Sequence, residues 1–133
     1  MTDLMQQIIN SGLDYANDLL EGGDEFYPFG IYVDNDKNVH PFEYEFDKKN
    51  MPSNGQISEW IESFCREEMA KKRILAYCIA SNASVKLEET KPFIETVCFD
   101  ITYPAETETP LYYVPFNSKN GKTKFGEIFA VKR

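Results

Sequence analysis

Apolar residues recur along the first part of the chain with the spacing of an α-helix. Between residues 3 and 21 they fall three or four positions apart, and Gly22-Gly23 follows, where glycine can take the positive φ that ends many helices. Gly12 lies in the middle, where glycine weakens a helix by about 1 kcal/mol relative to alanine. The pattern predicts a helix over residues 3–21.

The spacing then changes to the two-residue period of a β-strand. Residues 26–33 are rich in aromatic and β-branched residues, residues 34–38 are polar, and residues 39–46 form a second strand-like segment whose later part alternates between aromatic and acidic residues. The alternating side chains are Phe42, Tyr44 and Phe46 on one face and Glu43, Glu45 and Asp47 on the other. Two such segments joined by a short polar turn predict a β-hairpin.

A second helix has the clearest start signal of the chain. Ser53 and Gln56 have the spacing of a capping box, in which the two side chains satisfy backbone N–H groups reciprocally. The apolar stripe that follows consists of Ile57, Trp60, Ile61, Phe64 and Met69. The pairs Glu67–Lys71 and Glu68–Lys72 are spaced for ion pairing along the helix, which we expect to end near Lys72.

The rest of the chain has the character of strands. Apolar or alternating segments span residues 74–87, 93–103, 111–116 and 125–131, and the last is either a short strand or a docking tail. Turn-forming residues separate them at 88–92, 104–110 and Asn120-Gly121.

These elements predict an α+β fold in one domain, residues 1–133, with the order α-β-β-α-β-β-β and a possible eighth element, a β-strand. Strands joined by tight turns pair antiparallel. We therefore expect a five- to six-stranded, mainly antiparallel sheet with both helices packed on one face. This order resembles that of the roadblock and profilin-like sandwiches, a likeness of topology that implies no activity.

Three short segments also resemble a group of small bacterial proteins. They are Glu25–Gly30 (EFYPFG), Leu75–Ala80 (LAYCIA) and Phe125–Ala130 (FGEIFA). The likeness covers nearly the whole chain but is loose between these segments. Small acidic proteins of this kind often resemble the immunity partners of bacterial toxins, so the resemblance implies a protein-binding role, without assigned functional residues.

Charge narrows the choice of partners. Among 133 residues, 22 are acidic and 14 basic, giving a net charge of -8. A field of this sign repels phosphate backbones, so we expect no nucleic-acid ligand and favour a basic protein partner. The first residues lack the features of a signal peptide and no apolar run would span a bilayer, so we expect a cytoplasmic protein without membrane contact.

Residues of catalytic type are few. The cysteines Cys65, Cys78 and Cys98 lie in apolar segments without C-x-x-C spacing, which predicts small buried side chains in a reducing compartment. His40, the single histidine, shares a strand face with Phe42, and no nucleophile motif accompanies it. We therefore predict no catalytic site, no cofactor and no enzymatic activity.

Two motifs approach the pattern of ligand-binding loops and then depart from it. Asp34, Asp36, Asn38 and Glu45 occupy the spacing of a calcium-binding EF-hand, but Val39 stands where the loop needs glycine, and strands flank it. Gly121-Lys122-Thr123 ends like a phosphate-binding loop without the earlier glycine or a following helix. Both motifs predict turns, and no metal site is expected.

The leading hypothesis is a non-enzymatic protein-binding module, in its narrowest form an immunity-type inhibitor of a toxin. We expect charged contacts from Glu43, Glu45, Asp47 and Asp100, with Tyr44 or Tyr112 as an aromatic anchor, because tyrosine is enriched at interfaces. For the acidic strand face, the alternatives are a solvated surface and a pair of catalytic carboxylates. The alternative function is a homodimeric, roadblock-like scaffold or regulatory subunit, and a third is a small enzyme or ligand-binding domain with His40 facing a cavity.

Overall fold

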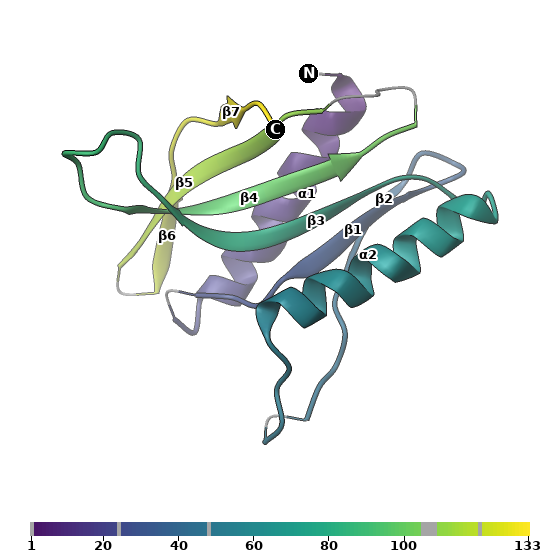
Figure 1. Cartoon of the computed structure of the whole chain (residues 1–133), viewed down its shortest axis with the longest axis horizontal. Helices are drawn as coiled ribbons and strands as arrows, with labels where there is room; N and C mark the ends of the chain where they lie inside the picture. The colour runs from purple at the N-terminus through teal and green to yellow at the C-terminus, as the bar shows by residue number, and fades with distance from the viewer. Residues whose placement is uncertain (1, 24, 48, 105–108, 120) are drawn as a thin grey trace.

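The computed structural model describes residues 2–23, 25–47, 49–104, 109–119 and 121–133 (Figure 1). Two helices and seven strands follow one another in the order α-β-β-α-β-β-β-β-β. Their bounds are α1 Asp3–Leu20, β1 Phe29–Asp34, β2 Val39–Phe42, α2 Asn54–Ala70, β3 Ile74–Val85, β4 Ile94–Thr102, β5 Leu111–Lys119, β6 Lys122–Phe125 and β7 Phe129–Val131. The predicted α+β class is therefore confirmed.

All the strand pairs are antiparallel, in the order β2-β1-β3-β4-β5-β6, with β7 also paired to β5. β6 and β7 follow the same outer edge of β5, and the register shifts by one residue between the pairs Phe116↔Phe125 and Tyr113↔Phe129. Pro115 lies opposite this irregularity, and its carbonyl accepts a 2.8 Å bond from the Gly126 N–H. Because proline cannot donate to a ladder, the bulge in the outer strand accommodates it.

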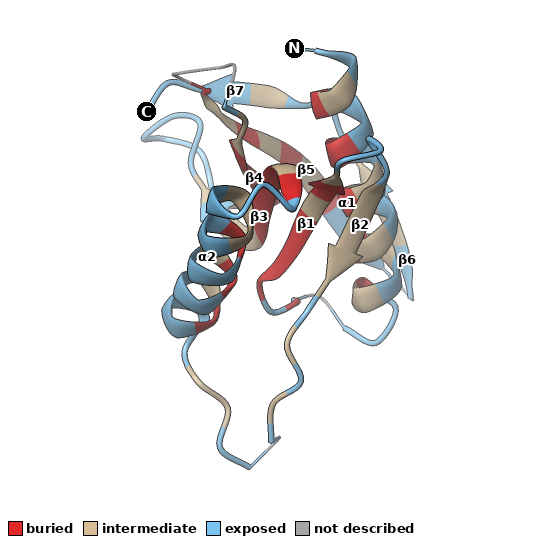
Figure 2. Cartoon of the chain, turned by 90° about the vertical axis from the view of Figure 1, so that its right-hand side faces the viewer, coloured by how far each residue is buried: buried red, intermediate tan, exposed pale blue. Residues whose placement is uncertain are grey.

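The two helices lie on opposite faces of the sheet, so the prediction that both pack on one face is wrong (Figures 1 and 2). α1 covers one face, with Ile8, Ile9 and Ala16 packed among side chains from β1, β3, β4 and β5. α2 covers the other face over β1 and β3, through Ile57, Ile61 and Cys65.

The physical reason lies in β3, the central strand with helices on both sides. Its residues Ala76, Cys78 and Ala80 face α1, while Tyr77 and Ile79 face α2, and all five are buried. A strand that is buried on both faces has a continuous apolar run instead of an alternation. Hairpin connections determine which strands pair. They do not determine on which face of the sheet each helix packs.

Local signals were more dependable. The capping box is present, since the Gln56 N–H donates to Ser53 Oγ at 3.2 Å and the Ser53 N–H donates to Gln56 Oε1 at 3.1 Å. Of the predicted ion pairs, Glu67–Lys71 forms at 3.0 Å. Glu68 pairs with Arg73 instead of Lys72, because α2 ends at Ala70, before the predicted end, and the chain turns there.

Other boundaries differ from expectation by a few residues. α1 ends at Leu20, and neither Gly22 nor Gly23 has a positive φ. The second hairpin strand ends at Phe42, not at residue 46. The turns predicted at 104–110 and at Asn120-Gly121 include residues 105–108 and 120, which lie outside the described residues. None of the described helices is long and apolar enough to cross a membrane.

Candidate interaction surface

Three of the four acidic side chains predicted to bind a partner, Glu43, Glu45 and Asp47, lie on the segment that joins β2 to α2. This segment extends away from the sheet at the bottom of Figures 1 and 2. Glu43, Glu45 and Asp47 are exposed, while Tyr44 and Phe46 are partly buried. The alternation of the sequence therefore persists after the strand has ended, and it sorts acidic side chains to solvent and rings toward α2.

The rings of this segment join two rings of α2 in one cluster. Between ring centroids, Phe42 lies 5.7 Å from Phe64, Tyr44 lies 6.5 Å from Phe64, and Phe46 lies 5.6 Å from Trp60. We call these five residues the aromatic cluster. The cluster is open to solvent, since Trp60 is 47% exposed and Phe64 is 42% exposed.

Beside the aromatic cluster is an open pocket of about 740 Å³. It is lined by Tyr15, Tyr27, Pro28, Phe42, Glu43, Tyr44, Glu45, Phe46 and Met51. These residues come from α1, from the chain before β1, from the end of β2 with the segment after it, and from the chain before α2. We call this the aromatic–acidic pocket, because its walls combine five aromatic rings with two carboxylates.

A hydrogen bond between two pocket residues joins α1 to the segment between β2 and α2, which we call the acidic segment. The Tyr15 hydroxyl donates to Glu43 Oε1 at 2.7 Å, and the Tyr15 ring lies 4.8 Å from that of Phe29 at the start of β1. Burial, the bond to Glu43 and the negative charge of Glu43 raise the pKa of Tyr15 to about 12. Tyr15 thus keeps its proton and holds the Glu43 carboxylate in place.

The position of Phe42, one of the pocket residues, depends on a glycine in β1. Gly30 lies directly opposite Phe42 in the β1–β2 register. A Cβ at Gly30 would lie 2.5 Å from Phe42 Cε1 and 2.8 Å from Ile61 Cγ2, closer than real Cβ atoms approach other atoms. The missing side chain lets the Phe42 ring pack closely against β1 and reach Phe64 of α2, which joins the sheet edge to the aromatic cluster.

Asp100 lies apart from the acidic segment, in the part of the α2-side face beyond β3. In the sheet register Phe42 pairs with Gly30, Gly30 with Ile79, and Ile79 with Asp100. Three strand spacings separate the two ends of this row by roughly 14 Å. The structure does not bring Asp100 together with Glu43, Glu45 and Asp47.

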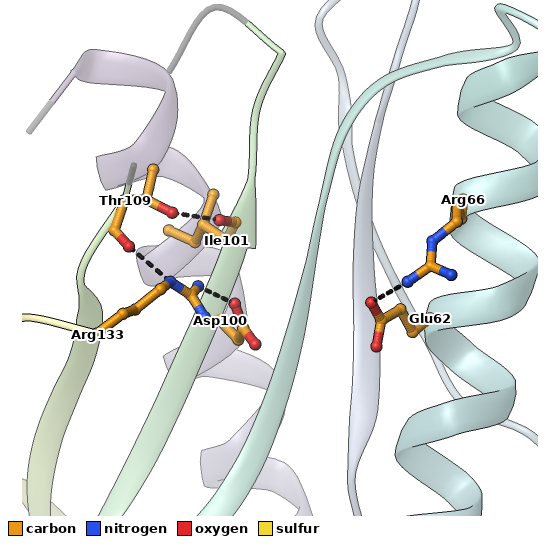
Figure 3. A network of polar contacts seen from close by, with 6 residues as sticks. All are labelled: Glu62, Arg66, Asp100, Ile101, Thr109 and Arg133. Atoms are coloured by element: carbon orange, nitrogen blue, oxygen red, sulfur yellow. Dashed lines mark hydrogen bonds and ion pairs between the residues drawn. The ribbon is translucent and has the colours of Figure 1, made fainter. Parts of the chain in front are cut away.

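Asp100 already has a cationic partner within the chain (Figure 3). Arg133 forms an ion pair with it, and Arg133 Nε also donates to the carbonyl of Thr109 at 2.7 Å. On α2, Glu62 and Arg66 pair separately at 2.5 Å. The negative charge of Asp100 is therefore compensated by Arg133, and it contributes little to the attraction of a basic partner.

The two tyrosines predicted as anchors have different positions. Tyr44 belongs to the aromatic cluster, and its hydroxyl donates to the Trp60 carbonyl at 3.4 Å. Tyr112 alternates with Val114 and Phe116 on the α1 side of β5, where it is 8% exposed and part of the core. A partner can reach Tyr44 but not the ring of Tyr112 without opening the core.

The calcium-like motif forms the predicted hairpin turn. Asp34 Oδ1 accepts from the N–H groups of Asp36 and Asn38 at 2.9 Å each, and Oδ2 accepts from His40 Nε2 at 2.8 Å. The bond from His40, followed by that from the Asn38 N–H, lowers the pKa of Asp34. Within the described chain no group of three or more His, Cys, Asp or Glu side chains is placed to hold a metal ion.

The cysteines are buried and free, as predicted. Burial, followed by the charge of Glu68, raises the pKa of Cys65 to about 12. Burial also raises the pKa of Cys78 and of Cys98. The thiolate is the nucleophilic form, and these buried thiols are in the protonated form at neutral pH.

Two contributions to the site were missed from the sequence. Trp60 and Phe64 were predicted only as members of the apolar stripe of α2, whereas the buried residues of α2 are Ile57, Ile61 and Cys65, and both rings remain exposed. The stripe with both rings is wider than one sheet face can cover, and this width was the available signal. No local pattern links Tyr15 to Glu43, 28 positions apart.

No protein-family model, curated protein or solved structure matches this chain.

Proposed function

We propose that this chain is a non-enzymatic protein-binding module whose partner is a basic protein. In its narrowest form the proposal is an immunity-type inhibitor, which would occlude a basic active-site cleft of a bacterial toxin. The observation that carries the proposal is the aromatic cluster, half open to solvent and bordered by Glu43, Glu45 and Asp47.

The aromatic cluster has the composition of an interface core. Tryptophan, tyrosine and phenylalanine are enriched in the buried centre of protein interfaces, and tryptophan and tyrosine are frequent binding hot spots. Trp60 and Phe64 retain large exposed areas, although each contacts another ring of the cluster. A partner that covered these rings would remove apolar surface from water.

The charges favour a basic partner. Three carboxylates border the rings, and the whole chain carries a net charge of -8. A field of this sign accelerates encounter with a positively charged protein, and it does so less at high salt. Steering by charge followed by burial of the rings is the mechanism that we propose.

The test begins with the tagged protein, used to capture a partner from the lysate of the cells that produce it and washed at rising salt. The captured protein is then identified, and its affinity is measured by calorimetry for two variants. The first reverses Glu43, Glu45 and Asp47 to lysine, and the matched control reverses Glu88, Glu89 and Glu127, which are exposed elsewhere. We expect the first variant to lose the partner and the control to keep it. Equal affinities would refute this surface as the binding site.

A homodimeric scaffold is the second candidate, and the edge formed by β7 favours it. β7 lies outside β5, and its Val131 is 44% exposed. Phe129 stacks on Tyr113 at 5.3 Å on the same part of the sheet. An apolar edge strand is a ready template for pairing with a second copy. Light scattering after size-exclusion chromatography decides: a dimer that persists on dilution supports the scaffold, and a monomer excludes it.

A further inference from the structure

The aromatic–acidic pocket combines two kinds of group that together bind organic cations. Aromatic rings attract a cation to their faces, and carboxylates accept charge-assisted hydrogen bonds. Both kinds come from a short stretch of chain, since Phe42, Tyr44 and Phe46 alternate there with Glu43 and Glu45. No lysine or arginine is among the described residues that line the pocket.

One of the carboxylates is held in position from another element. Tyr15 donates to Oε1 of Glu43, and a carboxylate has about four lone-pair sites, so the bond leaves capacity for further donors. The Tyr15 hydroxyl stays protonated at physiological pH and thus remains a donor. A carboxylate fixed in this way loses less conformational entropy when a cation binds than a freely rotating one.

The shape favours an extended cation over a metal ion. A volume of about 740 Å³ is in the range of pockets that bind small molecules and is far larger than one ion needs. The guanidinium group of arginine is planar, weakly hydrated and stacks on rings, and its five donors match carboxylates. The ammonium group of lysine is compact and strongly hydrated, so it gains less from ring walls.

We propose that the aromatic–acidic pocket is the subsite for an arginine side chain of the basic partner. The guanidinium group lies among the rings that line the pocket and donates to Glu43 and Glu45. This inference rests on the proposed function, and it specifies which chemical group of the partner is recognised. The arginine occupies the pocket while neighbouring partner residues cover the aromatic cluster next to it.

The single tryptophan of the chain reports on the pocket. Trp60 lies 5.6 Å from Phe46, a pocket residue, so occupancy should change its fluorescence. The probe is the peptide acetyl-Gly-Arg-Gly-amide, titrated into the full chain and followed by Trp60 emission and by amide chemical shifts. We expect a Kd on the order of 1 mM, because one side chain supplies only a fraction of an interface.

Matched ligands and variants make the result specific. The same peptide with citrulline, which has the shape of arginine without its charge, should not bind measurably. Glu43→Gln with Glu45→Gln should weaken binding of the arginine peptide about tenfold. Glu88→Gln with Glu89→Gln, an equal loss of charge on the β3–β4 turn, should change the Kd by about twofold or less.

Three results would overturn the inference. They are equal binding of the citrulline peptide, an unchanged Kd in the Glu43/Glu45 variant, and tighter binding of free arginine than of the peptide, which would indicate a small-molecule ligand. None of these results affects partner capture, which tests the proposed function separately. A captured partner that depends on the acidic segment while the peptide fails to bind would leave the protein-binding role intact and remove only the arginine subsite.

Discussion

Replacing Gly30 with alanine tests whether the sheet edge and the aromatic cluster are packed as described. The new methyl group would lie 2.5 Å from Phe42 Cε1, 2.6 Å from Phe42 Cζ and 2.8 Å from Ile61 Cγ2. Gly30 does not have a positive φ, so alanine meets no backbone strain there. The effect of the substitution therefore comes from packing.

Two opposing contributions set the magnitude. Removing a glycine from the unfolded chain stabilises the fold by about 0.4–1 kcal/mol. Inserting a methyl group into a filled space costs about 1–3 kcal/mol. Ile61 is fully buried, whereas Phe42 is only partly buried, so the Phe42 ring is the group that can move. We expect a net loss of about 1–2 kcal/mol in the free energy of unfolding, with the ring displaced from Phe64.

Urea unfolding followed by circular dichroism measures the loss, and Trp60 emission measures the displacement. Gly22→Ala is the matched control, because nothing lies within 4 Å of the position that its Cβ would take. The control should be neutral or slightly stabilising. If Gly30→Ala were as stable as Gly22→Ala, with Trp60 emission and peptide binding unchanged, the close contact of Phe42 with β1 would be refuted.

Two further predictions concern α1. Gly12→Ala improves helix propensity by about 1 kcal/mol, but its Cβ would lie 2.4 Å from the buried ring of Phe99. We therefore expect a net destabilisation of about 1–3 kcal/mol, measured by urea unfolding. A stabilised variant would contradict the packing of α1. Tyr15 has a pKa of about 12 in the fold against an ordinary 10.0, so it binds its proton more tightly when folded and contributes stability below pH 10 that is lost as the pH rises toward 12. Between pH 9 and pH 11.5 the urea midpoint of the natural chain should fall further than that of Tyr15→Phe, and parallel curves would exclude this contribution.

The sequence was sufficient for elements with strong local signals and insufficient for their arrangement. The capping box at Ser53 fixes the start of α2 through bonds between residues three positions apart, so it is visible in the sequence. The face on which α2 packs depends on side chains of other elements, in β1 and β3. The continuous apolar run of β3 did contain this information, because a strand covered on one face alone would alternate.

The residues of the candidate site also differ in how far local sequence patterns could predict their positions. Glu43, Glu45 and Tyr44 were identified from alternation, which persists although the segment is not paired in the sheet. Asp100 and Tyr112 were chosen by residue type, and their surroundings depend on strand parity and on a distant arginine. An aromatic ring that points to the α1 side of β5 is buried in the core whether or not it carries a hydroxyl group. Which residues of β5 point to that side follows only from the strand register.

The exposed rings also limit what the proposed interface can be. Trp60 and Phe64 together leave on the order of 200 Å² of side-chain surface open, given that large aromatic side chains bury about 150–250 Å² each. At about 25 cal/mol per Å² their burial would contribute about 5 kcal/mol, which only matches the lower estimates of what association costs in lost freedom. The rings alone therefore cannot support tight binding, so a tight complex must also engage the carboxylates beside them. Since Glu43 and Glu45 line the pocket and flank the cluster, a partner that uses both contributions must cover the segment between β2 and α2, and charge changes there should have the largest effect on its affinity.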